Sequence, residues 1–343
     1  MVSKTAGEDR PVGSGNAEVG SSRLSKAAGG GDRGRRLRVG SRASKLALWQ
    51  TEAVIGSLKG RHPEVEYEVV IVHTYGDKVT DVPLTAIGDT GLFVKEIEVA
   101  LAAGEIDFAV HSMKDVPTAL APGMVIAAVP ERADPRDAFV SHKFLSLTEV
   151  PPGGRIGTGS LRRVAQLRAA RPDLVFEPLR GNLDTRLRKL AELDLDGIIL
   201  AAAGLERLGW TSEVRERLDS SVCLPAAGQG ALAVEARAED GATLALLADI
   251  DDGRARLAVE AERAFLDRLG GGCHVPVGAL ARVDGSSLSL AGVVADPEGK
   301  RVLRDVGQGR PEHAATVGRD LAERMLAAGA TEILASLDGG GAR

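Results

Sequence analysis

From Leu37 onward the chain alternates between short apolar runs and longer segments whose apolar residues return every three or four positions. The short runs are typical of buried strands, and the longer segments are typical of helices packed on a sheet. In the first part of the chain this predicts strands at 37–40 and 68–74, around Phe108 and at 124–129, and helices at 46–58 and 93–103. These alternating elements indicate an α/β unit.

The same alternation returns after residues 131–137, a charged segment broken by Pro135 that we interpret as a hinge. Strands are expected at 155–157, 174–179 and 197–201, and helices at 161–170, at 185–193 and from Leu205. The loop 224–230 then leads into a further strand at 231–235. Two similar α/β lobes joined by a hinge predict a cleft between them.

The last 90 or so residues have a different pattern. A helix at 254–269 is followed by strands at 277–283, 288–294 and 301–306, which are joined by short turns, and by a final helix at 314–328. The predicted fold class is therefore α/β, with two lobes and a smaller C-terminal α+β domain. We expect residues 1–36 to form a disordered tail, 37–130 with 231–248 the first domain, 136–224 the second and 253–343 the third.

Composition narrows the range of partners. The 343 residues carry a formal net charge of -5 and only 3% aromatic residues, so neither a basic footprint nor a base-stacking platform for nucleic acid is expected. No apolar run approaches the roughly 18–20 residues needed to cross a membrane. The two cysteines, Cys223 and Cys273, form no disulfide framework, which favours a reducing cytoplasm.

The strand at Phe108 ends abruptly in the polar sequence Ser112-Met113-Lys114-Asp115. Ligands of open α/β sheets bind beyond the carboxyl ends of the strands, so a hydroxyl, an ammonium and a carboxylate at this place suggest a site. The alternative is a plain turn leading into Pro117, with Lys114 in solvent.

Arginines form the second signal, because several stand at turns between a strand and a helix. A helix N-terminus already favours anions through its free N–H groups. An arginine at this place is unfavourable unless an anion lies between its guanidinium and the helix. The turns concerned carry Arg38 and Arg42, Arg162 and Arg163 after the expected helix cap Ser160, and Arg180 and Arg186. We therefore expect several carboxylate or phosphate sites facing one cleft, although single surface arginines would need no ligand.

The third signal is Gly270-Gly271-Gly272-Cys273, where glycines give a cysteine room to project from a loop. An unremarkable loop thiol is one interpretation. A zinc site is not expected, because the adjacent Cys273 and His274 have no second ligand pair, and nothing specifies a cysteine protease. The remaining functional interpretation is a covalent anchor.

Together these motifs resemble the porphobilinogen deaminase family, also called hydroxymethylbilane synthases, from about Leu37 to the C-terminal region. The resemblance rests on 111–117, 157–163, Arg180-Gly181-Asn182 with Thr185-Arg186, 224–230 and 271–273. It implies two lobes like those of periplasmic binding proteins and a third domain. It also implies a dipyrromethane cofactor held by a thioether to Cys273, and no metal. Four porphobilinogens would be added to the cofactor with loss of ammonia, and hydroxymethylbilane then released by water.

By this resemblance Asp115 is the catalytic carboxylate. The positions matching the family's substrate and cofactor contacts are Arg38, Arg42, Ser44, Ser112, Lys114, Thr158, Ser160, Arg162, Arg163, Arg180, Asn182, Arg186 and Arg207. For Arg207 a surface salt bridge is an equally simple explanation. The resemblance further implies a monomer.

The chain departs from the family pattern mainly in the polar segment 76–91, which we expect to be mobile, and at His274, where glutamine is common. These differences concern contacts that close over the substrate. The rival hypothesis is a carboxylate-binding protein without enzymatic activity, which would have no use for an anchor at Cys273.

Overall fold

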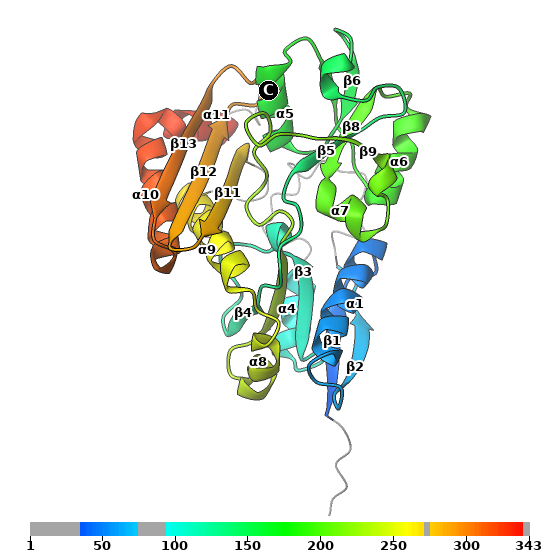
Figure 1. Cartoon of the computed structure of the whole chain (residues 1–343), viewed down its shortest axis with the longest axis vertical. Coiled ribbons are helices and arrows are strands. Elements are labelled where there is room, and N and C mark those ends of the chain that lie inside the picture. Colours follow the sequence, from blue (N-terminus) through cyan, green and yellow to red (C-terminus); the bar gives the residue numbers. More distant parts are fainter. Residues whose placement is uncertain (1–34, 75–93, 271–274, 339–343) are drawn as a thin grey trace, which may run out of the picture. The chain divides into compact units, whose positions relative to one another are not determined.

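The computed structural model describes residues 35–74, 94–270 and 275–338 (Figure 1), and the statements that follow concern these ranges. The first sheet has the strand order β2-β1-β3-β10-β4. Its strands are β1 (Arg36–Ser41), β2 (Glu66–Ile71), β3 (Phe108–Ser112), β4 (Met124–Ala128) and β10 (Leu232–Arg237). β1 pairs in parallel with β2 and β3, whereas β10 runs antiparallel to β3 and β4. The carboxyl ends of β1 and β3 therefore meet at one edge of this sheet.

The second sheet repeats this arrangement, with the order β7-β6-β8-β5-β9. Its strands are β5 (Asp137–Val140), β6 (Arg155–Gly157), β7 (Val175–Glu177), β8 (Gly197–Ala201) and β9 (Val214–Arg217). β6 is parallel to β7 and β8, and β5 is antiparallel to β8 and β9. The chain passes from the first sheet to the second between β4 and β5, and returns between β9 and β10. In each sheet the strand that it reaches first, β5 or β10, is the antiparallel inner strand. The chain thus crosses twice between two sheets of the same design.

Helices follow the parallel strands, as the apolar periodicity predicts, and one further helix follows β10. They are α1 (Lys45–Lys59), α4 (Lys95–Ala102), α5 (Leu161–Ala170), α6 (Leu183–Glu192), α7 (Ala202–Arg207) and α8 (Gly241–Ala248). Short 3-10 turns lie at η1 (Met113–Asp115), η2 (Leu147–Glu149), η3 (Thr211–Glu213) and η4 (Pro311–His313). At the cavity described below, β1, β7 and β8 lead into α1, α6 and α7, which brings helix N-termini to that edge, whereas β3 leads into the short turn η1.

The C-terminal part is a three-stranded antiparallel sheet, β11 (Val277–Asp284), β12 (Ser287–Ala295) and β13 (Val302–Gly309), packed with α9 (Gly253–Arg268) and α10 (Ala314–Met325). The helix predicted at 314–328 ends earlier than predicted, at Met325. It gives way to the wide turn η5 (Leu326–Ala330) and to α11 (Thr331–Asp338), because Gly329 has φ 107°, outside the helical region.

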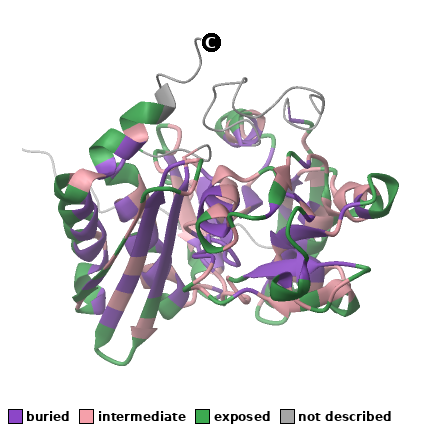
Figure 2. Ribbon diagram, turned by 90° about the horizontal axis from the view of Figure 1, so that it is seen from above, coloured by how far each residue is buried: buried purple, intermediate pink, exposed green. Residues whose placement is uncertain are grey.

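The predicted hinge 131–137 is also wrong at its end, because Asp137 begins β5 and its side chain is fully buried. A charged segment that contains proline suggests a linker exposed to solvent. Asp137 is buried instead, because its carboxylate forms ion pairs in the folded protein. β5, β9 and α8 were not predicted individually. Figure 2 shows the buried residues gathered along the strands and on the helix faces packed against them.

The predicted class, α/β with a smaller α+β part, is confirmed by these sheets. Among the described helices, none combines the length and the apolar character that a membrane span requires.

Candidate active site

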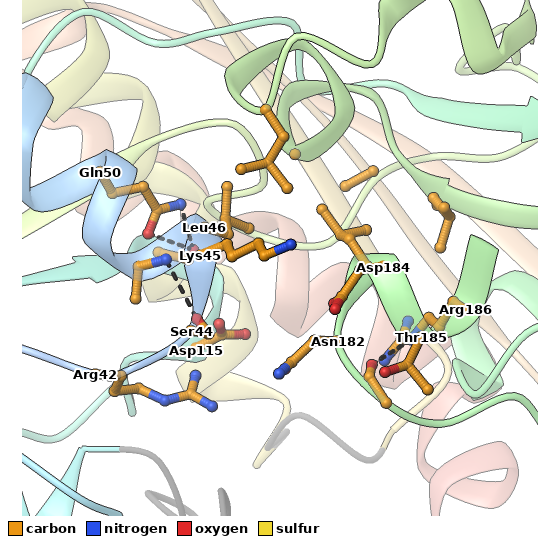
Figure 3. A pocket seen from close by; sticks show the side chains of 18 of the residues that line it. Arg42, Ser44, Lys45, Leu46, Gln50, Asp115, Asn182, Asp184, Thr185 and Arg186 are labelled. Atoms are coloured by element: carbon orange, nitrogen blue, oxygen red, sulfur yellow. Dashed lines mark hydrogen bonds between the residues drawn. The ribbon is translucent and has the colours of Figure 1, made fainter. Parts of the chain in front are cut away.

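A cavity of about 620 Å³ is lined by the carboxyl end of β3, the turn between β1 and α1, and the first turn of α6. Figure 3 shows Arg42, Ser44 and Asp115 on one side of it and Asn182 and Asp184 on the other. The lining therefore comes from both α/β sheets, as expected for a cleft between two lobes. It brings together residues that lie more than 100 positions apart in the sequence.

The β3 end supplies the carboxylate and the ammonium. The ladder to β10 stops at Ser112, whose side chain bonds to Gln50 of α1 at 2.9 Å between Nε2 and Oγ. η1 then turns Lys114 and Asp115 into the cavity. Burial lowers the pKa of Lys114 from 10.5 to about 8, against the opposing effect of Asp115. The site thus holds a carboxylate next to an amine that loses its proton unusually easily.

The start of α1 forms a second part of the wall. Ser44 is the N-cap and accepts a hydrogen bond from the backbone N–H of Ala47 at 3.2 Å. Arg42 precedes it and also lines the cavity. The free N–H groups of the first helical turn and this guanidinium favour an anion at the same place.

The turn before α6 supplies the largest group of cations. Gly181 has φ 114°, and a Cβ there would lie 2.8 Å from Cβ of Thr185, so the tight turn requires glycine. Nε of Arg186 donates to the carbonyl of Gly181 at 2.7 Å, and burial with the nearby Arg163 lowers the Arg186 pKa to about 10. Nη1 of Arg180 is buried and has no hydrogen-bond partner among the described residues. A buried guanidinium donor without a partner indicates that an acceptor is missing from this turn.

Two arginines of α5 share one buried carboxylate. Nη1 of Arg162 lies 2.7 Å from Oδ2 of Asp137, and Nη2 of Arg163 lies 2.7 Å from Oδ1. These two cations hold the pKa of Asp137 well below its usual range, despite full burial. Arg163 also lines the cavity, whereas Arg162 is directed to Asp137 and to the carbonyl of Leu224.

Most of the residues predicted for the site line this cavity. They are Arg42, Ser44, Ser112, Lys114, Asp115, Arg163, Arg180, Asn182 and Arg186. Asn182 is the N-cap residue of α6 but makes no side-chain capping bond. Its amide is therefore not committed to the helix.

Five predicted residues do not line the cavity in this structure. Arg38 stands early in β1, where its guanidinium is held by Asp107, with 2.9 Å between Nη2 and Oδ1. Its position before the middle of the strand, rather than after its end, explains why it points elsewhere. Arg162 is committed to Asp137 as described above.

Thr158 is buried beneath the β6–α5 turn, and its hydroxyl accepts a hydrogen bond from the backbone N–H of Ser160 at 3.3 Å. Ser160 is the N-cap of α5 as predicted, but its side chain makes no capping bond. Arg207 lines a different cavity, beside Trp49 and Glu131, and Nη2 donates to the carbonyl of Gly230 at 2.6 Å.

Cys273, His274 and the segment 76–91 lie outside the described residues. The sequence analysis missed other polar lining residues, which are His111 near the end of β3 and Lys45, Gln50, Asp184, Thr185, Arg188 and Lys189. Apart from His111, all of them stand in the first two turns of α1 or α6. Extending the search for polar residues by one turn into each helix that follows an arginine-bearing turn would have found them.

The electrostatics of the cavity define what it can hold. Its lining has eight arginine and lysine side chains against two aspartates, and one of these cations, Arg163, is paired with the buried carboxylate of Asp137. Such a site fits a ligand with several carboxylates, since arginine grips carboxylates at two points. The fold and the site define a two-lobed α/β protein with a cation-rich cavity suited to a polycarboxylate, in which Asp115 stands next to a low-pKa amine.

Comparison with known proteins identifies the family. Residues 37–245 match the porphobilinogen deaminase dipyrromethane cofactor binding domain, and residues 256–327 match the C-terminal domain of the same enzyme. The chain belongs to the porphobilinogen deaminase family.

Curated relatives agree over most of the chain. The porphobilinogen deaminase of Brevibacillus brevis is 50% identical over 301 residues, which cover 88% of this chain and 97% of the relative. That of Roseiflexus castenholzii is 52% identical over 299 residues, covering 87% of this chain and 98% of the relative. The predicted family is confirmed.

Two solved structures resemble part of this chain. The methionine binding protein MetQ has a TM-score of 0.41 and 14% identity, covering 63% of this chain and 89% of its own. Immunogenic lipoprotein A from Vibrio vulnificus has a TM-score of 0.40 and 13% identity, covering 65% and 98%. The two-sheet architecture is established by the strand orders given above.

Proposed function

We propose that the cavity between the two sheets is where this enzyme builds its product. As a porphobilinogen deaminase, the chain condenses four porphobilinogens, each with loss of ammonia, onto a dipyrromethane cofactor and releases hydroxymethylbilane by hydrolysis. This is a step of tetrapyrrole and haem biosynthesis. The roles of individual residues are the subject of the proposal.

The cavity suits the cofactor by its donors. Each pyrrole of the dipyrromethane carries two carboxylates, and the lining has an excess of cations, including a buried Arg180 Nη1 without a partner among the described residues. We assign the cofactor and substrate carboxylates to Arg42, Arg163, Arg180 and Arg186, with Ser44, Ser112 and Asn182 as neutral donors. When bound, the cofactor supplies the nucleophilic pyrrole carbon to which the first substrate is joined.

We assign general acid–base catalysis to Asp115. Departure of ammonia leaves a cationic methylene-pyrrole on the substrate, which a carboxylate in a site of low dielectric stabilises. The same carboxylate accepts pyrrole N–H bonds, and it takes up the proton released from carbon when the new carbon–carbon bond has formed. Asp184, the other lining aspartate, stands in the exposed first turn of α6 and is not given this role.

Lys114 is assigned a supporting role beside Asp115. Its pKa of about 8 leaves it mostly protonated near neutral pH, so it adds to the positive charge that faces the substrate carboxylates. Arg38, Arg162, Thr158, Ser160 and Arg207 are given no direct contact. The observation that carries the proposal is the position of Asp115 within a wall of cations from both sheets.

Asp115→Ala tests the assignment. We expect turnover to fall by at least about a thousandfold, the upper range for loss of general acid–base catalysis, while the anchored cofactor still assembles at least in part. Product formation from porphobilinogen and intact mass of the purified variant measure the two effects. Asp184→Asn is the comparison and should lose less than about tenfold. Near-normal turnover in Asp115→Ala would remove Asp115 from the mechanism.

Three expectations remain predictions. They are the domain boundaries, with 37–130 and 231–248 forming one unit, the monomeric state without a nucleic-acid partner, and the cytoplasmic location. Size-exclusion chromatography with light scattering measures the oligomeric state directly.

A further inference from the structure

Glu235 is a fully buried carboxylate at the centre of the first sheet that the proposed mechanism does not use. It lies in β10, diagonally across from His111 of β3, because His111 pairs with Ala233 and Glu235 pairs with Ala109. Nε2 of His111 lies 3.0 Å from Oε2 of Glu235, and the two side chains are 3% and 0% exposed. Neither oxygen of Glu235 accepts a hydrogen bond of good geometry from the described residues, so its stabilisation is mainly electrostatic.

Glu235 also acts on a second cation, Arg263 of α9. Burial lowers the Arg263 pKa, and the charge of Glu235 opposes that effect. The Arg263 guanidinium donates to three successive carbonyls, of Val116 at 2.9 Å, of Pro117 at 2.6 Å and of Thr118 at 3.1 Å. Arg263 thus fixes the chain immediately after Asp115.

These contacts bracket the catalytic turn. His111 is the residue before Ser112 in β3, and Val116 is the residue after Asp115. Glu235 therefore contacts one end of the segment 111–118, which carries Lys114 and Asp115, and Arg263 holds the other end. The charge of Glu235 reaches Arg263 only over a longer distance, and Glu235 acts from a strand that enters the first sheet from the second.

The remaining titratable neighbour is Glu98 of α4. Burial raises the Glu98 pKa, and the nearby Glu235 raises it further, while the backbone N–H of Ala121 donates to Glu98 Oε1 at 2.9 Å. Glu98 is thus a close neighbour of Glu235, and its charge also acts on His111, but it makes no hydrogen bond to the segment 111–118 that the structure records.

We propose that Glu235 is a positioning residue, which holds the Asp115 turn in its catalytic place through its contact with His111, while Arg263 fixes the chain on the other side of the turn. The inference rests on the proposed role of Asp115. It adds to that role a buried counter-charge outside the cavity, which touches neither substrate nor cofactor.

The test compares Glu235→Gln, which keeps the shape and removes the charge, with Glu98→Gln as the matched control. Hydrogen–deuterium exchange of the amides in 112–118 reports the turn directly, since the N–H groups of Met113 and Val116 are hydrogen-bonded in the wild type. We expect this segment to exchange at least about tenfold faster in Glu235→Gln and less than about threefold faster in Glu98→Gln, because Glu98 acts on His111 through its charge alone.

Kinetics are measured per cofactor-bearing molecule, counted by intact mass. For Glu235→Gln we expect kcat to fall about tenfold or more and the KM for porphobilinogen to stay within about threefold, the pattern of a misplaced catalytic group. His111→Gln should cause a smaller loss, and the double variant should lose less than the two single losses combined, because the same link is broken twice.

A lower melting temperature with unchanged kcat and unchanged exchange in 112–118 would make Glu235 a structural residue and overturn the proposal. Faster exchange with unchanged kcat would also overturn it, because the turn would then not need to be held. If Glu235→Gln does not fold, Glu235→Asp, which keeps the charge on a shorter side chain, should give milder losses of the same kind, and wild-type values there would count against the proposal. Activity remaining in Asp115→Ala would instead refute the mechanism itself and leave the exchange result intact.

Discussion

At the scale of single residues, the same side chain has different roles according to what it meets. Arg162 and Arg163 are neighbours in one helical turn, and both bind Asp137. Only Arg163 also lines the cavity. Arg162 therefore joins α5 to β5, whereas Arg163 does this and also faces the cavity. Removing Asp137 would leave two buried cations without their counter-charge, which generally costs several kcal/mol.

Lys114 allows a pH test at this scale. Its pKa is about 8 in the folded protein and 10.5 ordinarily, so between these values the unfolded chain binds more protons than the folded one. The free energy of unfolding therefore rises with pH across this window, by at most about 1.4 kcal/mol per pH unit. Urea unfolding at pH 8, 9 and 10, with cofactor-free Cys273→Ser protein, should show this rise, and the additional Lys114→Met change should abolish it.

The control for this measurement is Lys143, whose pKa is raised by hydrogen bonds to Asp194 and Asp196. Its contribution has the opposite sign, because stability present at lower pH is lost as pH rises. A Lys143→Met variant should therefore keep the rise attributed to Lys114. A wild-type stability that does not increase relative to Lys114→Met would contradict the lowered pKa.

At the scale of elements, α9 and α10 pack so closely that one position requires glycine. A Cβ at Gly318 of α10 would lie 2.9 Å from the backbone nitrogen of Phe265 and 3.0 Å from Cβ of Ala264. Backbone atoms of α9 cannot move aside as a flexible side chain can. The absence of a side chain at Gly318 thus brings the two helices together over the C-terminal sheet.

Gly318→Ala should therefore destabilise the protein by about 1–3 kcal/mol, the usual cost of overpacking. Gly56→Ala in α1 is the matched control, because a Cβ there meets nothing within 4 Å. It should stabilise the protein by about 0.5–1 kcal/mol, since alanine is the better helix former. Chemical denaturation of both variants measures the difference, and equal effects would mean that the helices separate easily.

At the scale of the whole molecule, Glu262 of α9 connects the C-terminal part to both chain crossings. Its carboxylate lies 2.6 Å from Nη1 of Arg132 in the first crossing and accepts the N–H of Gly228 in the second at 2.6 Å. It also accepts the N–H of Ala281 in β11 at 2.8 Å. The domain that precedes and follows the segment of Cys273 is thereby joined to the crossings next to the cavity.

The proposed tether gives a prediction at this scale. Protein purified from cells that make porphobilinogen should have a mass above that of the chain by one dipyrromethane, and Cys273→Ser should lack this increment. Cys223→Ser is the control and should keep it, because burial raises the pKa of Cys223 to about 12 and leaves its thiol unreactive. Intact-mass spectrometry decides the matter. An unmodified wild-type mass would refute the anchor.

Local signals were enough for much of the site. The apolar run ending at Ser112 and the arginines placed directly after strands, such as Arg42 and Arg180, were predicted because strand ends and helix starts are visible as patterns. Arg38 and Arg207 failed this test for a physical reason. An arginine inside a strand or at the end of a short helix can bind the same anions, but the direction of its side chain depends on which partners the fold places nearby.

The sequence by itself determined most of the strands and helices, the class of each part and the motifs that define the family, because these depend on periodicity and on residues close together in the chain. Only the tertiary structure decided which charges are buried together. Asp137 and Glu235 stand among ordinary neighbours in the sequence, and their partners lie 25 residues or more away. Burial removes water from such groups, so their partners decide whether they bind a ligand or hold the fold.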